Sequence, residues 1–203
     1  MNIVFIDKDP TKAGNQLPDN MLNASLKDSI QLLSNCVRKK LGKSGELNQE
    51  FKTPLGKAEM VAVYPYVLTT PDGSVENSTS PIIPVASELN SPQSLWVRAS
   101  KANFTWIVKF AKSICKEIAI RTDKDTSESL ATIKIIESFS SSLDFDWKGL
   151  TPPVIKGASI QDDDAVVCYR GMIHCKKVSW EKRKEGAPDW FNADLNEKLT
   201  KKP

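Results

Sequence analysis

Residues 91–121 read SPQSLWVRASKANFTWIVKFAKSICKEIAIR, and this stretch decides the fold. At about 100° per residue, its apolar residues gather on one side of a single helix: Trp96, Phe104, Trp106, Ile107, Phe110, Ile114 and Ile118. The cations fall within an arc of roughly 80° on the other side, namely Arg98, Lys101, Lys109, Lys112 and Lys116. The pattern predicts one long helix with its tryptophans in the core and its cations in solvent.

This basic stripe has two interpretations. Lysine faces often serve only solubility. Unopposed positive charge also attracts a phosphate backbone, and Glu117 is the one acid among residues 91–121. The C-terminal segment favours the second interpretation, because from Arg170 to Pro203 nine Lys or Arg stand against five Asp or Glu. The candidate nucleic-acid-binding residues are Arg98, Lys101, Lys109, Lys112, Lys116, Arg170, Lys177 and Lys184.

Aromatic residues are interleaved with the C-terminal cations: Trp180, Trp190 and Phe191. Rings beside cations suit single-stranded nucleic acid, whose bases stack while its phosphates pair with the cations. Core packing is the commoner use of tryptophan. Both interpretations stay open.

Two polar residues lie on the apolar side of the predicted helix, Ser100 and Asn103. A buried amide needs hydrogen-bond partners. Asn103 therefore either bonds to a neighbouring element or lines a pocket with Arg98 at its edge. The candidate pocket residues are Trp96, Ser100, Asn103 and Trp106.

The chain opens with NIVFIDKDPT, an apolar run that predicts a buried strand ending in a turn. Asp7, Asp9 and Thr11 match the Asp-x-Asp-x-Thr pattern of haloacid-dehalogenase-like phosphatases, in which the first Asp is the nucleophile. That chemistry needs a doubly wound parallel sheet, and the sequence lacks the strands for one. The structural alternative is that Asp9 caps a helix starting at Pro10 while Asp7 pairs with a base elsewhere.

The remaining pattern predicts an α+β fold, a helix-dominated single domain over 1–203 with a small β-element. The β-element would be the N-terminal strand and a hairpin near 59–75. Further helices are expected over 19–42, 126–140 and 162–184, followed by a short one near the C-terminus. Residues 43–58 and 74–90 have loop-like composition, and 198–203 form a basic tail.

The cysteine and histidine content argues against metal chemistry. The four cysteines, Cys36, Cys115, Cys168 and Cys175, form no Cys-x-x-Cys pair, so no zinc site is expected. We expect instead reduced thiols that pack in helices. The single histidine, His174, is more typical of a surface or structural role than of catalysis. No signal peptide and no membrane-spanning run is expected, so the protein should act inside a cell.

Three motifs resemble a family of uncharacterised proteins from tailed bacteriophages. They are the opening MNIVFIDKDPTKA, the central PQSLWVRASKANFTW and the closing YRGMIHCKKVSWEKR with PDWF. The central motif is matched by Trp96, Arg98, Ser100, Asn103 and Trp106. The family pattern also has a His-Cys-Asp-Lys-His cluster, and here the stretch reads Leu17-Pro18-Asp19-Asn20-Met21. The resemblance implies a phage origin and argues against chemistry that needs the missing groups.

Three functions remain as hypotheses. The first is a phage-encoded, non-catalytic accessory protein that binds single-stranded DNA or RNA through the basic helix face, in the cytoplasm of the infected host cell. The second is a protein that binds a host factor. The third is a nucleotide- or DNA-processing enzyme with Asp7, Asp9 and Asp19 as its carboxylates, the one case in which a cofactor, Mg²⁺, would be needed.

Overall fold

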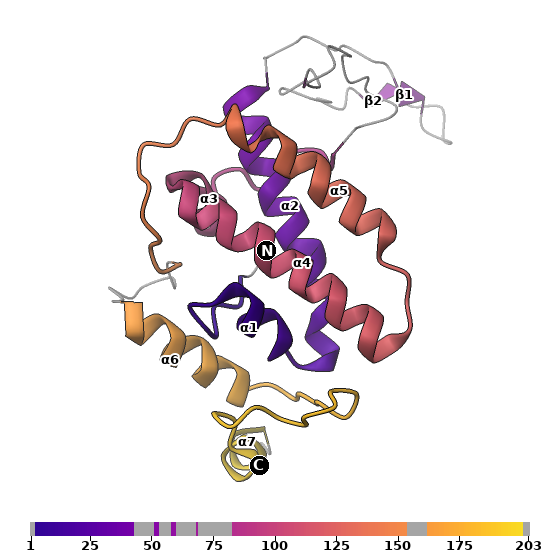
Figure 1. The fold of residues 1–203 in the computed structure, drawn as a ribbon, viewed down its shortest axis with the longest axis vertical. Helices are drawn as coiled ribbons and strands as arrows, with labels where there is room; N and C mark the ends of the chain where they lie inside the picture. The colour runs from indigo at the N-terminus through magenta and orange to yellow at the C-terminus, as the bar shows by residue number, and fades with distance from the viewer. Residues whose placement is uncertain are drawn as a thin grey trace.

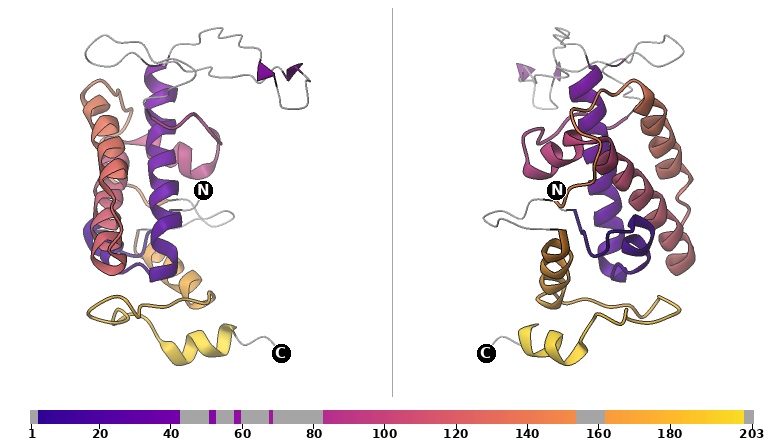
Figure 2. Two further views of the ribbon diagram at one scale, coloured as in Figure 1. Left: turned by 90° about the vertical axis from the view of Figure 1, so that its right-hand side faces the viewer. Right: turned by 60° about the vertical axis from the view of Figure 1, so that its left-hand side comes forward.

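Two long crossing helices form the centre of the molecule in the computed structural model, which describes residues 3–42, 51–52, 58–59, 68, 83–153 and 162–200. Helix α2 (Leu22–Leu41) crosses α4 (Lys101–Thr122), and α5 (Ser127–Ser138) lies beside α4 (Figures 1 and 2). The 3-10 helix η1 (Asp19–Met21) leads into α2, and η2 (Phe139–Ser141) extends α5. Leu22, Leu26, Leu33 and Val37 of α2 are buried in the shared core, as their spacing predicts.

The predicted long helix over 91–121 is two helices, α3 (Pro92–Ala99) and α4, and the prediction of one helix was wrong. Ser100 is extended between them, with φ −148° and ψ 155°, and its Oγ accepts a hydrogen bond from the Asn103 N–H at 3.0 Å. A serine N-cap satisfies an amide that the first turn leaves unpaired. Ser100 also forms a parallel β-bridge with Trp147, so a distant segment holds the break in place.

The N-terminal run is buried but joins no strand among the described residues. Ile3, Val4, Phe5 and Ile6 are each at most 6% exposed. The Ile6 carbonyl accepts a hydrogen bond from Arg170 Nε at 2.9 Å, so a side chain takes the place of a neighbouring strand.

Helix α1 (Pro10–Asn15) begins where the sequence predicts, with Asp9 as its N-cap. Asp9 Oδ1 accepts hydrogen bonds from the Thr11 and Lys12 amides at 2.7 and 3.2 Å. Gly14 then allows a close approach to α4, because a Cβ at that position would lie 2.5 Å from Ser113 Oγ. Helix α1 therefore fixes the chain that precedes it against α4.

The α+β class was wrong, because the described part of the chain is helical. Its only strand pairing is the two-residue antiparallel ladder of β1 (Phe51–Lys52) and β2 (Ala58–Glu59). The predicted hairpin near 59–75 lies mostly outside the described residues. Residues 83–90 contain no helix or strand before Ser91 caps α3.

The C-terminal segment forms two short helices, α6 (Asp162–His174) and α7 (Ala193–Thr200). Both lie at one end of the α2–α4 pair (Figure 1). The helix predicted over 162–184 therefore ends ten residues early, at His174, and α7 includes the first part of the predicted tail. Residues 201–203 lie outside the described residues.

The four cysteines divide into two buried thiols and two exposed ones, and all four are free. Cys36 and Cys115 are fully buried in helices α2 and α4. Cys168 and Cys175 are exposed, so the expectation that all four thiols pack in helices was wrong for this pair. Burial raises the pKa of the Cys36 thiol from 9.0 to about 12 and that of Cys115 to about 11.

We expect a thiol reagent at pH 8 to label Cys168 and Cys175 in the folded protein and all four cysteines after denaturation. Below pH 9 the buried thiols are neutral in both the folded and unfolded states. As the pH rises above 9, the unfolded thiols ionise first, so the contribution of these thiols to stability is lost toward pH 11–12. Rapid labelling of Cys36 in the folded protein would contradict its burial.

Candidate nucleic-acid interface

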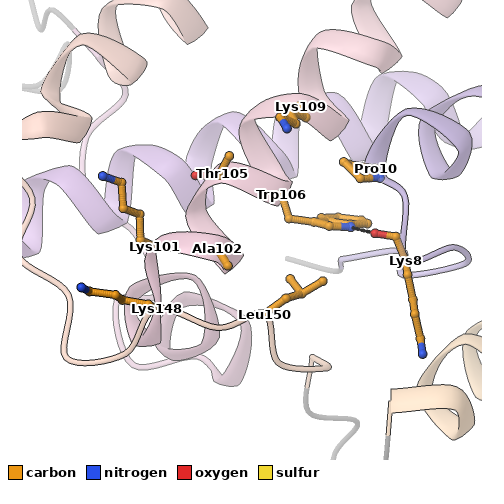
Figure 3. Close-up of a pocket in the computed structure, with 9 residues that line it drawn as sticks. All are labelled: Lys8, Pro10, Lys101, Ala102, Thr105, Trp106, Lys109, Lys148 and Leu150. Carbon is orange, nitrogen blue, oxygen red and sulfur yellow. Dashed lines mark hydrogen bonds between the residues drawn. The ribbon is translucent and has the colours of Figure 1, made fainter.

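A basic hollow of about 630 Å³ lies at the N-terminal end of α4. Three segments meet there: the turn into α1, the first turns of α4, and residues 148–150 (Figure 3). We refer to it as the basic hollow and define it by its lining residues: Lys8, Pro10, Lys101, Ala102, Thr105, Trp106, Lys109, Lys148 and Leu150.

Two long-range hydrogen bonds bring these segments together. The Trp106 Nε1–H donates to the Lys8 carbonyl at 2.8 Å and ties the turn before α1 to α4 (Figure 3). The Lys101 amide donates to the Trp147 carbonyl at 3.2 Å and places residues 147–150 beside the start of α4. The second bond also satisfies one of the amides that a helix N-terminus leaves unpaired.

The charge of the basic hollow is positive and largely unopposed. Lys101, Lys109 and Lys148 are exposed and make no ion pair with any residue that the structure describes. Lys8 contributes a fourth ammonium group, and none of the described lining residues is acidic. Two acids flank Lys8 in the chain: Asp9 caps α1, and Asp7 lies 3.7 Å from Arg170. Asp146, two residues before Lys148, is exposed. Low-dielectric walls beside like charges focus a positive potential, which favours an anion.

The wall of the basic hollow is mostly apolar. Pro10, Ala102, Trp106 and Leu150 supply hydrocarbon surface between the lysines (Figure 3). Leu150 is 39% exposed, whereas Trp106 is 3% exposed and has its ring packed in the core. The site therefore combines ammonium groups at its edge with apolar surface, which suits a ligand with both phosphate and ring or sugar groups.

The structure does not place the predicted basic stripe in one row. Lys101 and Lys109 lie in the basic hollow, while Lys112 pairs with Glu137 of α5 at 2.5 Å. Lys116 is exposed farther along α4. Arg98 belongs to α3, where its Nη1 is buried with no hydrogen-bond partner among the described residues and its charge lowers the pKa of Cys36 of α2 against the larger effect of burial.

The C-terminal candidates are divided in the same way. Arg170 bonds to the Ile6 carbonyl, lies 3.7 Å from Asp7 and sits over the Trp190 ring at 5.2 Å, so it holds the N-terminal run to α6. Lys177 and Lys184 are exposed but do not line the basic hollow.

The C-terminal rings pack on one another and on His174, which favours their interpretation as packing residues. His174 stacks on Phe191 with ring centroids 5.0 Å apart, and Trp180 and Phe191 lie 4.4 Å apart. Trp180 and Trp190 donate their Nε1–H groups to the backbone and side chain of Gln16, at 3.0 and 2.8 Å.

His174 is a structural residue by its hydrogen bonds. It is 7% exposed, and its Nε2 accepts from the Asn192 amide at 2.9 Å. Its Nδ1 therefore carries the proton and donates to the Arg170 carbonyl at 2.9 Å. The Nε2 bond thus joins α6 to the segment before α7, while the Nδ1 bond lies within α6.

The four predicted pocket residues are at most 4% exposed, and three of them, Trp96, Ser100 and Asn103, form a hydrogen-bonded joint. Asn103 Nδ2 donates to the Trp96 carbonyl at 2.8 Å and to Thr151 Oγ1 at 2.9 Å, and its Oδ1 accepts from the Thr151 amide at 3.0 Å. Trp96 Nε1 donates to the Thr151 carbonyl at 2.7 Å. Asn103 and Ser100 therefore make internal hydrogen bonds instead of lining a pocket. Of the four residues, only Trp106 lines the basic hollow.

The candidate carboxylates have structural partners and do not come together. Asp7 accepts from the Asp9 amide and faces Arg170, and Asp9 caps α1. Asp19 pairs with Arg121 at 3.0 Å and accepts from the Lys182 amide at 2.9 Å. Over the described ranges, no group of three or more His, Cys, Asp or Glu could hold a metal ion.

Sequence reasoning missed Lys8, Lys148 and Leu150 in the basic hollow, and Trp147 beside it. Residues 144–150 read DFDWKGL, a stretch with no helical periodicity. That stretch gives no local signal that its tryptophan is exposed, since Trp180 also lies outside the helices and is buried.

Comparisons with protein-family models, with curated proteins and with solved structures find no match for this chain. Among the described helices, none is both long and apolar enough to cross a lipid bilayer. The functional argument therefore depends on the geometry and charge of the basic hollow.

Proposed function

We propose that this protein is a non-catalytic accessory protein that binds nucleic acid at the basic hollow. The observation that carries the proposal is that Lys101, Lys109 and Lys148, none of which pairs with an acid among the described residues, line one hollow together with Lys8, with no acid among its described lining residues. Three separate segments of the chain supply these lysines, so their convergence is a property of the fold and not of one helix face.

The chemistry of lysine favours phosphate as the group that is bound. An ammonium group is a compact point charge that pairs with a phosphate oxygen without reading a base edge. Binding should therefore depend strongly on salt and weakly on sequence. The volume of about 630 Å³ lies within the range of roughly 300–1,000 Å³ typical of small-ligand sites, so a phosphate with its attached sugar can enter.

The resemblance to tailed-phage proteins supplies the biological setting of the proposal. An accessory protein made during infection would meet DNA and RNA in the cytoplasm of the host cell. Lysine–phosphate contacts do not distinguish the two, since both backbones carry the same charge. Either nucleic acid is therefore included in the proposal.

Charge reversal at Lys101 and Lys109 tests the proposal. We expect K101E/K109E to bind a fluorescently labelled oligonucleotide about 10- to 100-fold more weakly than the unmodified protein at roughly 0.1 M salt, because two ammonium contacts become repulsive. Fluorescence anisotropy with a DNA and an RNA strand of the same sequence gives both dissociation constants.

The matched control is K124E/K134E, which changes the net charge equally at two exposed lysines outside the basic hollow. This control should change the dissociation constant by less than about threefold, since screening limits charges beyond roughly 10 Å. Equal losses in the two variants would contradict a localised site. Thermal unfolding of both variants shows whether the fold is retained.

A further inference from the structure

Trp147 is the only one of the five tryptophans whose indole N–H has no hydrogen-bond acceptor among the described residues. Trp96, Trp106, Trp180 and Trp190 each donate their Nε1–H group to an acceptor within 3.0 Å. Trp147 has no such bond within the described chain, and the residue is 60% exposed to solvent. Its ring therefore contributes little to the core.

The backbone of Trp147 is nevertheless held firmly beside the basic hollow. Its carbonyl accepts from the Lys101 amide at 3.2 Å, and it bridges to Ser100. The indole lies over Gly149, where a Cβ would come within 2.7 Å of the ring Nε1. The ring is thus anchored at its base, open to solvent on its surface, and followed directly by Lys148 of the basic hollow.

We propose that Trp147 stacks on an unpaired base of a single strand whose phosphates lie against Lys101 and Lys148. This inference rests on the proposed function and names its ligand more narrowly. An exposed ring beside unpaired cations suits a ligand with a flat π-face and adjacent negative charge, as a nucleotide has. A base inside a duplex is already stacked on its neighbours, so Trp147 favours single strands over duplexes.

The test compares three ligands with W147A, W147F and the unmodified protein. The ligands are a single-stranded oligonucleotide, a duplex of equal length, and inorganic polyphosphate, which carries phosphates but no bases. We expect W147A to weaken single-strand binding about 5- to 100-fold and to leave polyphosphate binding within twofold. W147F should retain most of the single-strand affinity, because a phenyl ring can also stack.

Intrinsic fluorescence gives a second readout. The oligonucleotide should quench the emission of the unmodified protein, and W147F should lose this quenching because the other four tryptophans are buried or hydrogen-bonded. Unchanged single-strand affinity in W147A, with a loss in K101E/K109E, would overturn this inference and leave the proposed function standing. Equal losses for the oligonucleotide and polyphosphate would also overturn it. Failure of the unmodified protein to bind any nucleic acid would overturn both this inference and the proposed function. In that case, loss of a co-purifying protein in W147A would assign the ring to a protein partner.

Discussion

Replacing Arg121 with alanine is expected to lower the free energy of unfolding by about 3–5 kcal/mol, because it leaves buried charges unpaired. The Arg121 side chain is 1% exposed and lies 2.9 Å from Glu117 and 3.0 Å from Asp19. It also donates to the Leu17 carbonyl at 2.7 Å and to the Asn15 carbonyl. One guanidinium therefore joins the C-terminal end of α4 to the turn between α1 and α2.

Chemical denaturation of R121A and of K116A measures this effect. Lys116 is an exposed residue of the same helix, so its removal should change stability by less than about 0.5 kcal/mol. A loss below about 1 kcal/mol in R121A would show that Glu117 and Asp19 find other partners or water. The buried network would then not be what fixes the turn.

Replacing Trp106 with alanine is the second change with a large expected effect, about 3–5 kcal/mol of stability. Its ring is stacked on Phe110 with centroids 4.8 Å apart and lies 4.9 Å from Phe5. The substitution leaves a cavity between these rings and removes the hydrogen bond to the Lys8 carbonyl. We also expect weaker oligonucleotide binding, since Lys8 and Pro10 lose their tie to α4.

The natural comparison for W106A is W147A, which removes the same side chain from an exposed position. Equilibrium unfolding should show W147A within about 1 kcal/mol of the unmodified protein. Near-UV circular dichroism reports whether the aromatic cluster is retained. Similar destabilisation by the two substitutions would contradict the core position of Trp106.

Local signals predicted those elements whose ends are fixed by neighbouring residues. Asp9 before Pro10 predicts the start of α1, and Gly42 after the last apolar turn predicts the end of α2. The break at Ser100 escaped notice because no Gly or Pro marks it, although Ser100 and Asn103 interrupt the apolar face. The N-terminal run suggested a strand because periodicity cannot show whether an extended backbone bonds to a strand or to a side chain such as Arg170.

The sequence predicted only part of the candidate site for a similar reason. Helical spacing placed Lys101 and Lys109 on one face of the helix, as α4 does. Lys8 reaches the same cavity because its carbonyl accepts from Trp106, and Lys148 because the carbonyl of its neighbour Trp147 accepts from the Lys101 amide. Such pairings depend on the tertiary fold, so the residues that complete the basic hollow could not be read from local pattern. The ion pair between Lys112 of α4 and Glu137 of α5 also depends on the tertiary fold, so the sequence pattern did not predict it.

The dependence of oligonucleotide affinity on salt tests most directly whether the basic hollow binds a phosphate backbone. With Lys101, Lys109 and Lys148 engaged, the logarithm of the association constant should fall linearly with the logarithm of salt concentration, with a slope of about −2 for a single strand. K101Q/K109Q should bring the slope closer to zero by about 1.4, since two phosphate contacts are lost. Binding that does not change with salt, or an unchanged slope in the variant, would contradict the claim that the basic hollow binds a phosphate backbone.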